Sequence, residues 1–452
     1  MHDVNPNKVY LVSLGCDKNR VDGEVMIGNL RNAGFNVIND PSVAQAIIVN
    51  TCGFIRDAVQ ESIDLVLELA AYKQDGECKG LVIVGCMSER YRSEIKESIP
   101  EADAILGVKE YDQIAAVVAK LVGIKLNESG QIENTDPFLS RLAARHDDVI
   151  PHIAYVKISE GCDNHCAYCT IPSIRGAYTS RSMENILEEC RQLITSGVKE
   201  LVLVAQDTAL YGVDIYGEKK LPELLRKIAE LGDGGELPWI RLMYAYPEHI
   251  TPELIQTMAD TPQICKYIDM PIQHSEDNVL KKMGRASSKN DLINLISTLR
   301  EKIHGIAIRT TLMVGFPGET VENFRDLYKF VKQMQFDRLG VFPYSREEGT
   351  PAATMPQQVK PEIKQVRLKR IMALQQEIHF AKQKAMVGKT VTVIVDSPEP
   401  QNGAYSARTQ QDAYEVDSVV YVKSNKPLKL GQICQVTITD AEEYDLYANH
   451  TE

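Results

Sequence analysis

Three cysteines lie close together in the segment EGCDNHCAYCTIPSIRG, at positions 162, 166 and 169. Thiolates are the usual ligands of iron–sulfur clusters and of many zinc sites, so a loop of this kind can wrap one metal centre. Structural zinc sites usually take four ligands, whereas no fourth cysteine follows here and His165 lies inside the loop. A cluster on three thiolates leaves one iron open for an external ligand, such as an amino acid that chelates through its amine and carboxylate. We therefore expect an iron–sulfur cluster on Cys162, Cys166 and Cys169.

Cys16, Cys52 and Cys86 are far apart in the sequence, yet each ends an apolar run that predicts a buried strand. The runs are VYLVSLGC, AIIVNTC and GLVIVGC. The carboxyl ends of parallel strands lie together at one edge of a sheet, where ligands usually bind. Single cysteines are common in buried strands, but three at equivalent strand ends favour a shared metal centre. The sequence thus predicts a second cluster with three protein ligands.

The remaining cysteines, Cys78, Cys190, Cys265 and Cys434, have no such neighbours, and we interpret them as packing residues. The first residues lack the basic and apolar regions of a signal peptide. No apolar run approaches the roughly 20 residues of a membrane span. We therefore expect a cytoplasmic protein with no membrane contact, in which the ten cysteines do not form disulfides.

The elements that must position these cysteines follow an α/β pattern, in which strand and helix signals alternate. Residues 8 to about 125 predict a mostly parallel sheet with the strands KVYLVSLGC, FNVI, AIIVNTC and GLVIVGC. Helical stretches such as 57–72 and 88–98 separate them. From residue 153 a second alternation has six strand candidates: AYVKISEGC, ELVLVAQD, WIRLMYAY, YIDMPIQH, IAIRTTLMVGF and RLGVFPYS. Six βα units predict a partial (βα)6 barrel.

A long amphipathic helix is expected over residues 361–386, with apolar residues at Ile363, Val366, Ile371, Leu374, Ile378 and Ala381. After it, the stretches KTVTVIVDS, YEVDSVVYVK and QICQVTITDAEEYDLYA predict a small antiparallel β-barrel of the OB-like kind. The expected domains are a cluster domain at 1–126, a polar linker at 127–149, the barrel with its helix at 150–386 and the small β-barrel at 387–452.

Two features of the sequence resemble a known family. The loop of Cys162, Cys166 and Cys169 resembles the signature of the radical-AdoMet superfamily, and its combination with Cys16, Cys52 and Cys86 resembles the methylthiotransferases. Within that group, five stretches resemble the RimO branch: SLGCDKNRVDGE, AQDTALYG, YIDMPIQHS, FPYSREEGT and YDLY. The sequence departs from this pattern at Gly23, where Ser is expected, and at Ala448, where Gly is expected.

The resemblance implies an amino-terminal cluster domain, a radical-AdoMet barrel and a carboxyl-terminal TRAM domain, with two 4Fe–4S clusters and S-adenosyl-L-methionine (AdoMet) as cofactors. The cluster in the barrel loop would chelate AdoMet, and its cleavage would give a 5′-deoxyadenosyl radical that removes hydrogen from an unactivated carbon. Sulfur from the second cluster would then be added, after methylation by another AdoMet. No residue beyond the cofactors is expected to act as a catalytic acid or base.

Candidate AdoMet contacts are polar residues and glycines at the ends of barrel strands. Arg181 would pair with the methionyl carboxylate, and Gln206 and Asp207 would bind the amine or ribose. Gly315 and Gly318 lie in GFPGE, which lets a backbone approach a ligand closely. Gln273 and His274 end the fourth strand, and Tyr344 and Ser345 end the sixth, each with a structural role as the alternative.

The implied substrate is the β-carbon of an aspartate in small-subunit ribosomal protein number twelve, free or in the ribosome. The implied electron donor is a flavodoxin or a ferredoxin. Two alternatives remain, the same chemistry on adenosine in transfer RNA and a non-catalytic iron–sulfur carrier. The net charge of −12 favours a basic partner over a polyanion. Residues 387–452 hold five Lys and Arg against ten Asp and Glu, so no RNA contact is expected through the TRAM domain.

Overall fold

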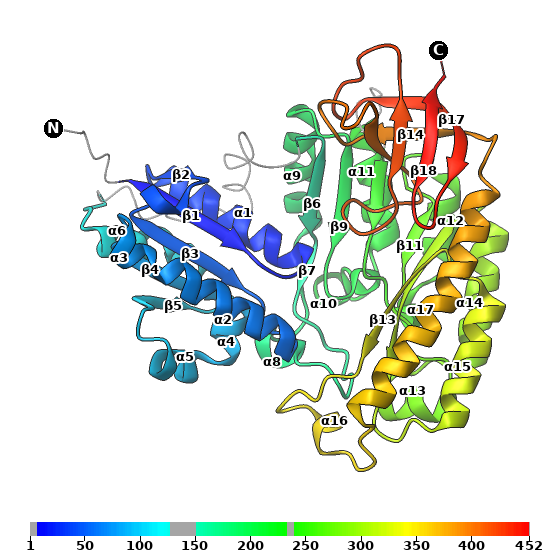
Figure 1. The fold of residues 1–452 in the computed structure, drawn as a ribbon, viewed down its shortest axis with the longest axis horizontal. Helices are drawn as coiled ribbons and strands as arrows, with labels where there is room; N and C mark the ends of the chain where they lie inside the picture. The colour runs from blue at the N-terminus through cyan, green and yellow to red at the C-terminus, as the bar shows by residue number, and fades with distance from the viewer. Residues whose placement is uncertain (1–6, 127–150, 233–238, 452) are drawn as a thin grey trace. The chain divides into compact units, whose positions relative to one another are not determined.

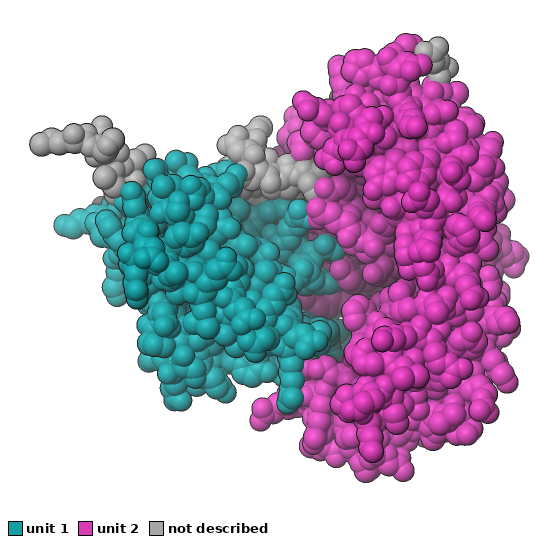
Figure 2. All heavy atoms as spheres, viewed as in Figure 1, with its two compact units in different colours: residues 1–150, 160–164, 169–178 teal, residues 151–159, 165–168, 179–452 magenta. Residues whose placement is uncertain are grey.

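The computed structural model describes residues 7–126, 151–232 and 239–451 (Figure 1). The linker expected at 127–149 lies outside these residues. The described chain forms two compact units (Figure 2). The first contains the described residues of 1–150 together with 160–164 and 169–178, and the second contains 151–159, 165–168 and the described residues from 179 onward.

The first unit is a five-stranded parallel sheet with the order β2-β1-β3-β4-β5. Its strands are β1 (Lys8–Ser13), β2 (Asn36–Ile38), β3 (Ala46–Thr51), β4 (Gly80–Gly85) and β5 (Ala104–Leu106). Its helices are α1 (Asp17–Asn32), α2 (Arg56–Ala70), α3 (Tyr72–Asp75), α4 (Cys86–Arg90), α5 (Arg92–Ser98), α6 (Ile114–Val122) and α8 (Ile171–Arg175), with the 3-10 turns η1 (Pro41–Val43) and η2 (Tyr111–Gln113). Four strands were expected, and β5 is a fifth that its three residues did not reveal.

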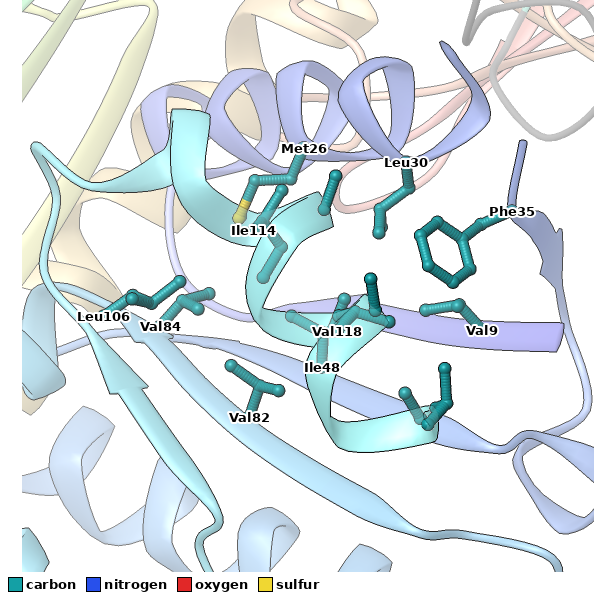
Figure 3. Close-up of a cluster of buried hydrophobic side chains, with 14 residues drawn as sticks. Val9, Met26, Leu30, Phe35, Ile48, Val82, Val84, Leu106, Ile114 and Val118 are labelled. Atoms are coloured by element: carbon teal, nitrogen blue, oxygen red, sulfur yellow. The ribbon is translucent and has the colours of Figure 1, made fainter. Parts of the chain in front are cut away.

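Helices cover both faces of this sheet, which is why β3 and β4 are buried at every position. Ile48 of β3 packs with Met26 and Leu30 of α1 and with Ile114 of α6, and Figure 3 shows this cluster. Ile47 and Val49 point to the other face, where Val66 of α2 packs. The alternation of side chains along a strand thus places one apolar run into two cores.

The second unit contains the expected six-stranded partial barrel. Its strands are β6 (Ile153–Lys157), β9 (Glu200–Val204), β10 (Trp239–Leu242), β11 (Tyr267–Asp269), β12 (Ala307–Val314) and β13 (Arg338–Pro343). They pair in parallel as two three-stranded sheets, β10-β9-β6 and β11-β12-β13. Backbone hydrogen bonds from Ala245 to Asp269 (2.8 Å) and from Cys265 to Ile240 (2.9 Å) join the two sheets. The short strands β7 (Ser159–Glu160) and β8 (Thr179–Ser180) flank the cysteine loop in the sequence.

Helices alternate with these strands and lie along the outside of the barrel (Figure 1). They are α9 (Met183–Thr195), α10 (Val213–Tyr216), α11 (Leu221–Leu231), α12 (Pro252–Asp260), α13 (Asp277–Met283), α14 (Lys289–Lys302), α15 (Val321–Met334), α16 (Pro351–Thr354) and α17 (Pro361–Lys384), with the turns η5 (Thr208–Leu210) and η6 (Pro247–His249). Capping boxes begin α14 at Ser288 and α15 at Thr320, where each cap and its N3 side chain satisfy two backbone donors.

The apolar stripe expected along α17 is only partly correct. Ile371, Leu374 and Ile378 are buried, but Ile363 is 43% exposed and Val366 is 57% exposed. The buried face also includes Gln375 and His379, which hydrogen-bond to the backbone of residues 336, 337 and 444. Polar residues can take core-facing positions here because backbone oxygens accept their hydrogen bonds.

The carboxyl-terminal residues form a closed five-stranded barrel in the order β14-β15-β16-β18-β17. The strands are β14 (Thr390–Val395), β15 (Tyr405–Thr409), β16 (Val420–Lys423), β17 (Ile433–Ala441) and β18 (Leu446–His450). The expectation of an antiparallel barrel fails at one place, because β16 and β18 pair in parallel. Strand direction cannot alternate all the way around a closed ring of five strands, so one parallel pair is required.

This small barrel packs on the amino-terminal ends of the six larger-barrel strands. The contacts join His152 to Asp396 (2.8 Å), Glu200 to Arg408 (2.7 Å), Arg241 to the backbone of Gln410 (2.8 Å), Tyr267 to Asp417 (2.7 Å), Arg309 to Asp417 (3.7 Å) and Arg338 to Asp412. Each of the six strands therefore has a polar contact to the small barrel within or next to it. We call this set of contacts the amino-end interface.

A separate observation concerns membranes. Among the helices of the described residues, none is both long enough and apolar enough to cross a bilayer.

Candidate active site

The cysteines at positions 16, 52 and 86 come together at the carboxyl edge of the first sheet. They follow β1, β3 and β4, which are neighbours in the sheet. The Cys16 thiol is close enough to raise the pKa values of both the Cys52 and the Cys86 thiols, after the larger effect of burial. Cys16 is also the N-cap of α1.

Each of these cysteines is next to a glycine, and the packing explains why. Gly15 has φ +92°, and a β-carbon there would lie 3.0 Å from the Cys52 sulfur. A β-carbon at Gly53 would lie 2.7 Å from the backbone of Cys86. The glycines allow three loops to approach more closely than side chains would permit.

Burial raises the pKa values of two thiols in this triad. Burial raises the pKa of the Cys86 thiol to about 11, although the nearby Arg175 guanidinium opposes that shift. The Cys52 pKa is raised for the same reason. A metal centre held here, as the sequence predicts, would have to displace protons from the Cys52 and Cys86 thiols, and its binding energy would supply the difference.

The cysteine loop divides between the two units. Cys162 and Cys169 belong to the first unit, and Cys166 belongs to the second. The Cys162 amide donates to Gly176 at 3.1 Å, and the Cys169 sulfur accepts from the Ile171 amide at 3.4 Å. A β-carbon at Gly161 would lie 2.1 Å from the Ala177 oxygen, so the loop can close only with glycine at that position.

A half-buried tyrosine and a buried arginine lie beside Cys166. The Tyr246 hydroxyl is 3.3 Å from the Cys166 sulfur, and burial raises the pKa of this phenol well above its ordinary value. If Cys166 ligates a cluster, as the sequence predicts, this phenol can donate to its sulfur. The Arg285 guanidinium stacks 3.6 Å from the Tyr246 ring centre and donates to the Pro271 oxygen at 2.8 Å. Hydrogen bonds to ligand sulfurs and nearby charge are what tune a cluster.

Each predicted cluster site has three thiols as its donors, and the ligand role of these six cysteines stays a prediction. Among the described residues, no three His, Cys, Asp or Glu side chains converge tightly enough to hold one metal ion. A tetrahedral zinc ion needs all its ligands about 2.3 Å from one point, whereas a 4Fe–4S cluster spreads its thiolates over several irons. The other cysteines match their expected packing role, because Cys78, Cys190 and Cys265 are buried and Cys434 is half-buried on β17.

Two of the expected AdoMet contacts already have protein partners. Arg181 donates to the Lys157 oxygen (2.8 Å), to Glu189 (2.6 Å) and to Asn185. Asp207 is fully buried, its carboxylate accepts from the Ala209 amide at the start of η5, and its other oxygen lies 2.6 Å from His249 Nδ1. Both side chains hold neighbouring elements in place, and an AdoMet contact by either stays a prediction.

Gln206 and Gln273 are in a different situation. Both polar atoms of the Gln206 side chain are buried without a hydrogen-bond partner among the described residues. Such atoms are costly unless something satisfies them, so Gln206 can hold a polar ligand at the end of β9. Gln273 has φ +69°, a strained conformation for a residue with a side chain, and its backbone bonds to Thr311 and Met313.

The GFPGE turn approaches side chains of this chain. Gly315 and Gly318 have φ +74° and +79°, and β-carbons there would lie 2.3 Å from Lys364 and 2.7 Å from Lys282. The Gly315 amide donates to Glu319, whose carboxylate pairs with Arg367 at 3.0 Å. His274 is fully buried, its Nδ1 accepts from the Glu276 amide at 3.0 Å, and burial lowers its pKa to about 3.

Sequence reasoning missed Tyr244, Tyr246 and Arg285. Tyr244 has φ +58° and lies two residues after the end of β10, and Gln273, expected to end the fourth strand, lies four residues after β11. Residues in such strained conformations concentrate at functional sites. Taking polar residues at the end of the third strand, as was done for the second and fourth, would have selected both tyrosines. Arg285 follows α13, and no pattern in the sequence marks it.

Comparison with known proteins places this geometry in a class and a family. Residues 8–107 match the uncharacterized protein family UPF0004, residues 156–331 match the Radical SAM superfamily and residues 387–450 match the TRAM domain. The fold and the site thus define a radical-AdoMet iron–sulfur enzyme. Relatives named ribosomal protein uS12 methylthiotransferase RimO include one from Lachnoclostridium phytofermentans, 46% identical over 97% of this chain and 99% of the relative, and one from Clostridium kluyveri, 47% identical over 97% of each. The chain belongs to the RimO family of methylthiotransferases.

Solved structures agree on the fold. The radical S-adenosylmethionine methyltransferase TsrM from Kitasatospora setae, with tryptophan and an AdoMet analogue bound, has a TM-score of 0.56 at 15% identity, covering 82% of this chain and 89% of that one. The cobalamin-dependent radical enzyme OxsB, with aqua-cobalamin and AdoMet bound, has a TM-score of 0.51 at 12% identity, covering 83% and 58%. As a radical-AdoMet methylthiotransferase, the chain uses iron–sulfur clusters and AdoMet.

Proposed function

We propose that this enzyme adds a methylthio group to the β-carbon of an aspartate in ribosomal protein uS12. The relatives named as uS12 methylthiotransferases support this substrate, since they align over nearly the whole chain. The observation that carries the proposal is a second cysteine triad, because Cys16, Cys52 and Cys86 meet at a sheet edge separate from the barrel loop. One triad would serve radical chemistry, and the second would supply the sulfur.

In this proposal, Cys162, Cys166 and Cys169 hold the cluster that binds AdoMet, and Cys16, Cys52 and Cys86 hold the other. When bound, AdoMet and its cluster supply the radical that removes hydrogen from a carbon no acid or base can activate. The proposed enzyme has three domains with the limits expected from the sequence, which are 1–126, 150–386 and 387–452.

The chain's own residues orient the ligands and exclude water. Gln206 offers its unsatisfied amide to AdoMet, and the Tyr246 hydroxyl, 3.3 Å from the Cys166 sulfur, can donate to a thiolate there. Tyr168, which contacts Cys166, packs edge to face on Phe316 with ring centres 6.5 Å apart, and Phe316 packs in the same way on Tyr344 at 5.5 Å. Buried aromatic rings next to a reactive centre protect it from water and from side reactions.

The charge of the TRAM domain has a different distribution from the one its sequence suggests. Three of its acidic residues are paired with residues of the large barrel in the amino-end interface, namely Asp396, Asp412 and Asp417. Among the described residues of this domain, the exposed charges are Lys389, Lys423, Lys426 and Lys429 against Glu399, Glu415, Asp440, Glu442 and Glu443. Four positive and five negative side chains nearly balance, so this surface cannot attract a basic protein strongly. The expectation of no RNA contact through the TRAM domain stays a prediction.

A stronger acidic surface lies on α2, which follows Cys52 in the chain. Asp57, Glu61, Asp64 and Glu68 are exposed on this helix and line a shallow groove of about 570 Å³ with Leu14 and Leu65. Their spacing places all four carboxylates along one side of the helix. We infer that this stripe attracts uS12, since proteins that bind ribosomal RNA are basic. We also propose a cytoplasmic location and a flavodoxin or ferredoxin as the electron donor.

Mass spectrometry of uS12 from cells with and without the gene tests the proposal. An aspartate heavier by one methylthio group only when the gene is present would support it. Unchanged uS12, with loss of a methylthio group from adenosine in transfer RNA, would overturn it in favour of the nucleic-acid substrate.

A further inference from the structure

Arg175 is a buried cation at the end of α8, six residues after Cys169 in the sequence. Its side chain is 1% exposed. It donates to Asp22 of α1 at 2.9 Å and to Glu160 at 3.0 Å. A guanidinium removed from water needs partners of opposite charge, and here two carboxylates supply them.

The same guanidinium also contacts the amino-terminal triad. One nitrogen lies 3.2 Å from the Cys86 sulfur and 3.4 Å from the Asn19 side-chain oxygen. Asn19 in turn donates to the Leu14 oxygen at 2.6 Å, two residues before Cys16. The fixed fork of an arginine can therefore orient the Cys86 sulfur and the loop of Cys16 together.

Arg175 belongs to a segment that connects the two predicted cluster sites. The segment 169–178, which begins with a cysteine of the barrel loop, belongs to the same compact unit as Cys16, Cys52 and Cys86. The Thr170 hydroxyl is 3.4 Å from the Phe54 oxygen, two residues after Cys52. This short segment thus begins with Cys169, a predicted ligand of one cluster, and its Arg175 contacts Cys86, a predicted ligand of the other.

We propose that Arg175 is a positioning residue for the amino-terminal cluster, which fixes the Cys86 thiolate and raises the reduction potential of the cluster held there. The inference rests on the proposed function, because it requires a cluster on Cys16, Cys52 and Cys86. A positive charge and an N–H donor at a ligand sulfur both favour the more reduced, more negative cluster. Asp22 and Glu160 act in the opposite direction, so the potential reflects the balance among these three groups.

The test uses the full-length protein with Cys162, Cys166 and Cys169 replaced by Ala, so that iron reconstituted into it reports the amino-terminal cluster. The midpoint potential is measured by a redox titration followed by electron paramagnetic resonance. We expect Arg175→Met to lower the potential, and Arg175→Lys to lower it less, because lysine keeps the charge but loses the fork.

Glu160→Gln is the matched control. It removes a negative charge from the same ion-pair network and leaves the contact between Arg175 and Cys86 in place. Its side chain is 34% exposed, so the substitution is tolerable for folding. We expect the potential to stay or rise. If the substitutions only loosened the site, Arg175→Met and Glu160→Gln would shift the midpoint potential in the same direction. The proposed role predicts that the potential falls in Arg175→Met and does not fall in Glu160→Gln.

If Arg175→Met fails to hold iron, Arg175→Lys decides. A lowered potential in that variant supports the proposal, and a potential equal to that of the parent overturns it. The proposal is also overturned if Glu160→Gln lowers the potential as much as Arg175→Met. If the parent holds no iron, the proposed function and this inference are both overturned. If the parent holds iron but the Arg175 variants have the same midpoint potential as the parent, the inference alone is overturned.

Discussion

Arg408 of β15 donates to Glu200 at the start of β9 at 2.7 Å, with exposed fractions of 3% and 0%. Arg241 donates to the same carboxylate at 2.6 Å. Burial alone would raise the Glu200 pKa, but the two guanidinium groups lower it to about 2. The carboxylate is therefore ionised at all physiological pH values, and it joins the small barrel to the large one.

Replacing Glu200 with Gln should destabilise the protein strongly. The change leaves two buried guanidinium groups without their shared anion, and breaking a buried pair in this way costs about 3–5 kcal/mol. Equilibrium urea unfolding of the apoprotein measures the loss. Glu253→Gln is the control, because its partner Arg226 is 45% exposed and surface pairs contribute at most about 1 kcal/mol. Equal losses in the two variants would contradict the importance of the buried carboxylate.

Removing the two cysteine triads separately should divide the iron. Alanine at Cys162, Cys166 and Cys169 should remove about half of the iron and all reductive cleavage of AdoMet. Alanine at Cys16, Cys52 and Cys86 should remove the other half and spare the formation of 5′-deoxyadenosine. Iron analysis and chromatography of the nucleoside products measure both effects. Full iron content in the second variant would mean that the amino-terminal cluster does not exist.

Gly85→Ala should disable the amino-terminal site. Gly85 has φ +100° and ψ −155°, a region that only glycine occupies readily. A β-carbon there would lie 2.6 Å from the Asn50 side chain and the Thr51 oxygen, so Cys86 must move. We expect about half of the iron to be lost on reconstitution. Gly34→Ala is the control, since φ is +93° but nothing lies within 4 Å. Similar iron in both variants would show that the clash is harmless.

His274 should make stability depend on pH below neutrality. Burial, with Arg367 as a smaller cause, lowers its pKa from 6.5 to about 3. The unfolded chain therefore binds a proton that the folded protein excludes between these values. Stability is complete above pH 6.5 and falls by up to about 1.4 kcal/mol per pH unit towards pH 3.

His274→Asn should remove this dependence, because the Asn oxygen can still accept from the Glu276 amide. Urea unfolding of the apoprotein at several pH values compares it with the parent and with His304→Asn, a change at an exposed histidine. Parallel curves for the parent and His274→Asn would refute the assignment.

Reversing charges on α2 should slow the association of uS12 more than reversing charges on the TRAM domain. Asp64→Lys with Glu68→Lys and Glu442→Lys with Glu443→Lys change the net charge equally, and all four side chains are exposed. We expect the α2 pair to lower the association rate constant several-fold at low salt. The difference should shrink as salt rises, because ions screen the attraction. Stopped-flow binding measures both, and equal effects would reassign the docking surface.

Much of this architecture could be predicted because its signals are local. The apolar runs before Cys16, Cys52 and Cys86 define parallel strands, and parallel strands place their ends together whatever the rest of the chain does. Strand β5 was not predicted, because three residues are too few to show a hydrophobic periodicity. The parallel pairing of β16 and β18 follows from closing a ring of five strands, which no single stretch of sequence encodes.

The AdoMet contacts were harder to predict, because a polar residue at a strand end has several uses. Arg181 and Asp207 resemble ligand-binding residues in the sequence, yet Asn185, Glu189 and His249 already pair with them. The partner of a side chain comes from another element, and its distance along the chain has no fixed value. Arg175 shows the same limit, since Asp22 lies 153 residues away.

The amino-end interface has a consequence for how this sequence can evolve. The small β-barrel contacts all six strands of the partial barrel, so we expect the two barrels to evolve as one unit. A mutation at Glu200 or Arg338 is tolerable only if Arg408 or Asp412 changes with it. Homologous sequences should therefore show correlated substitutions across these pairs. Recombination that exchanges residues 387–452 between distant relatives should fail unless the matching strand residues travel with them.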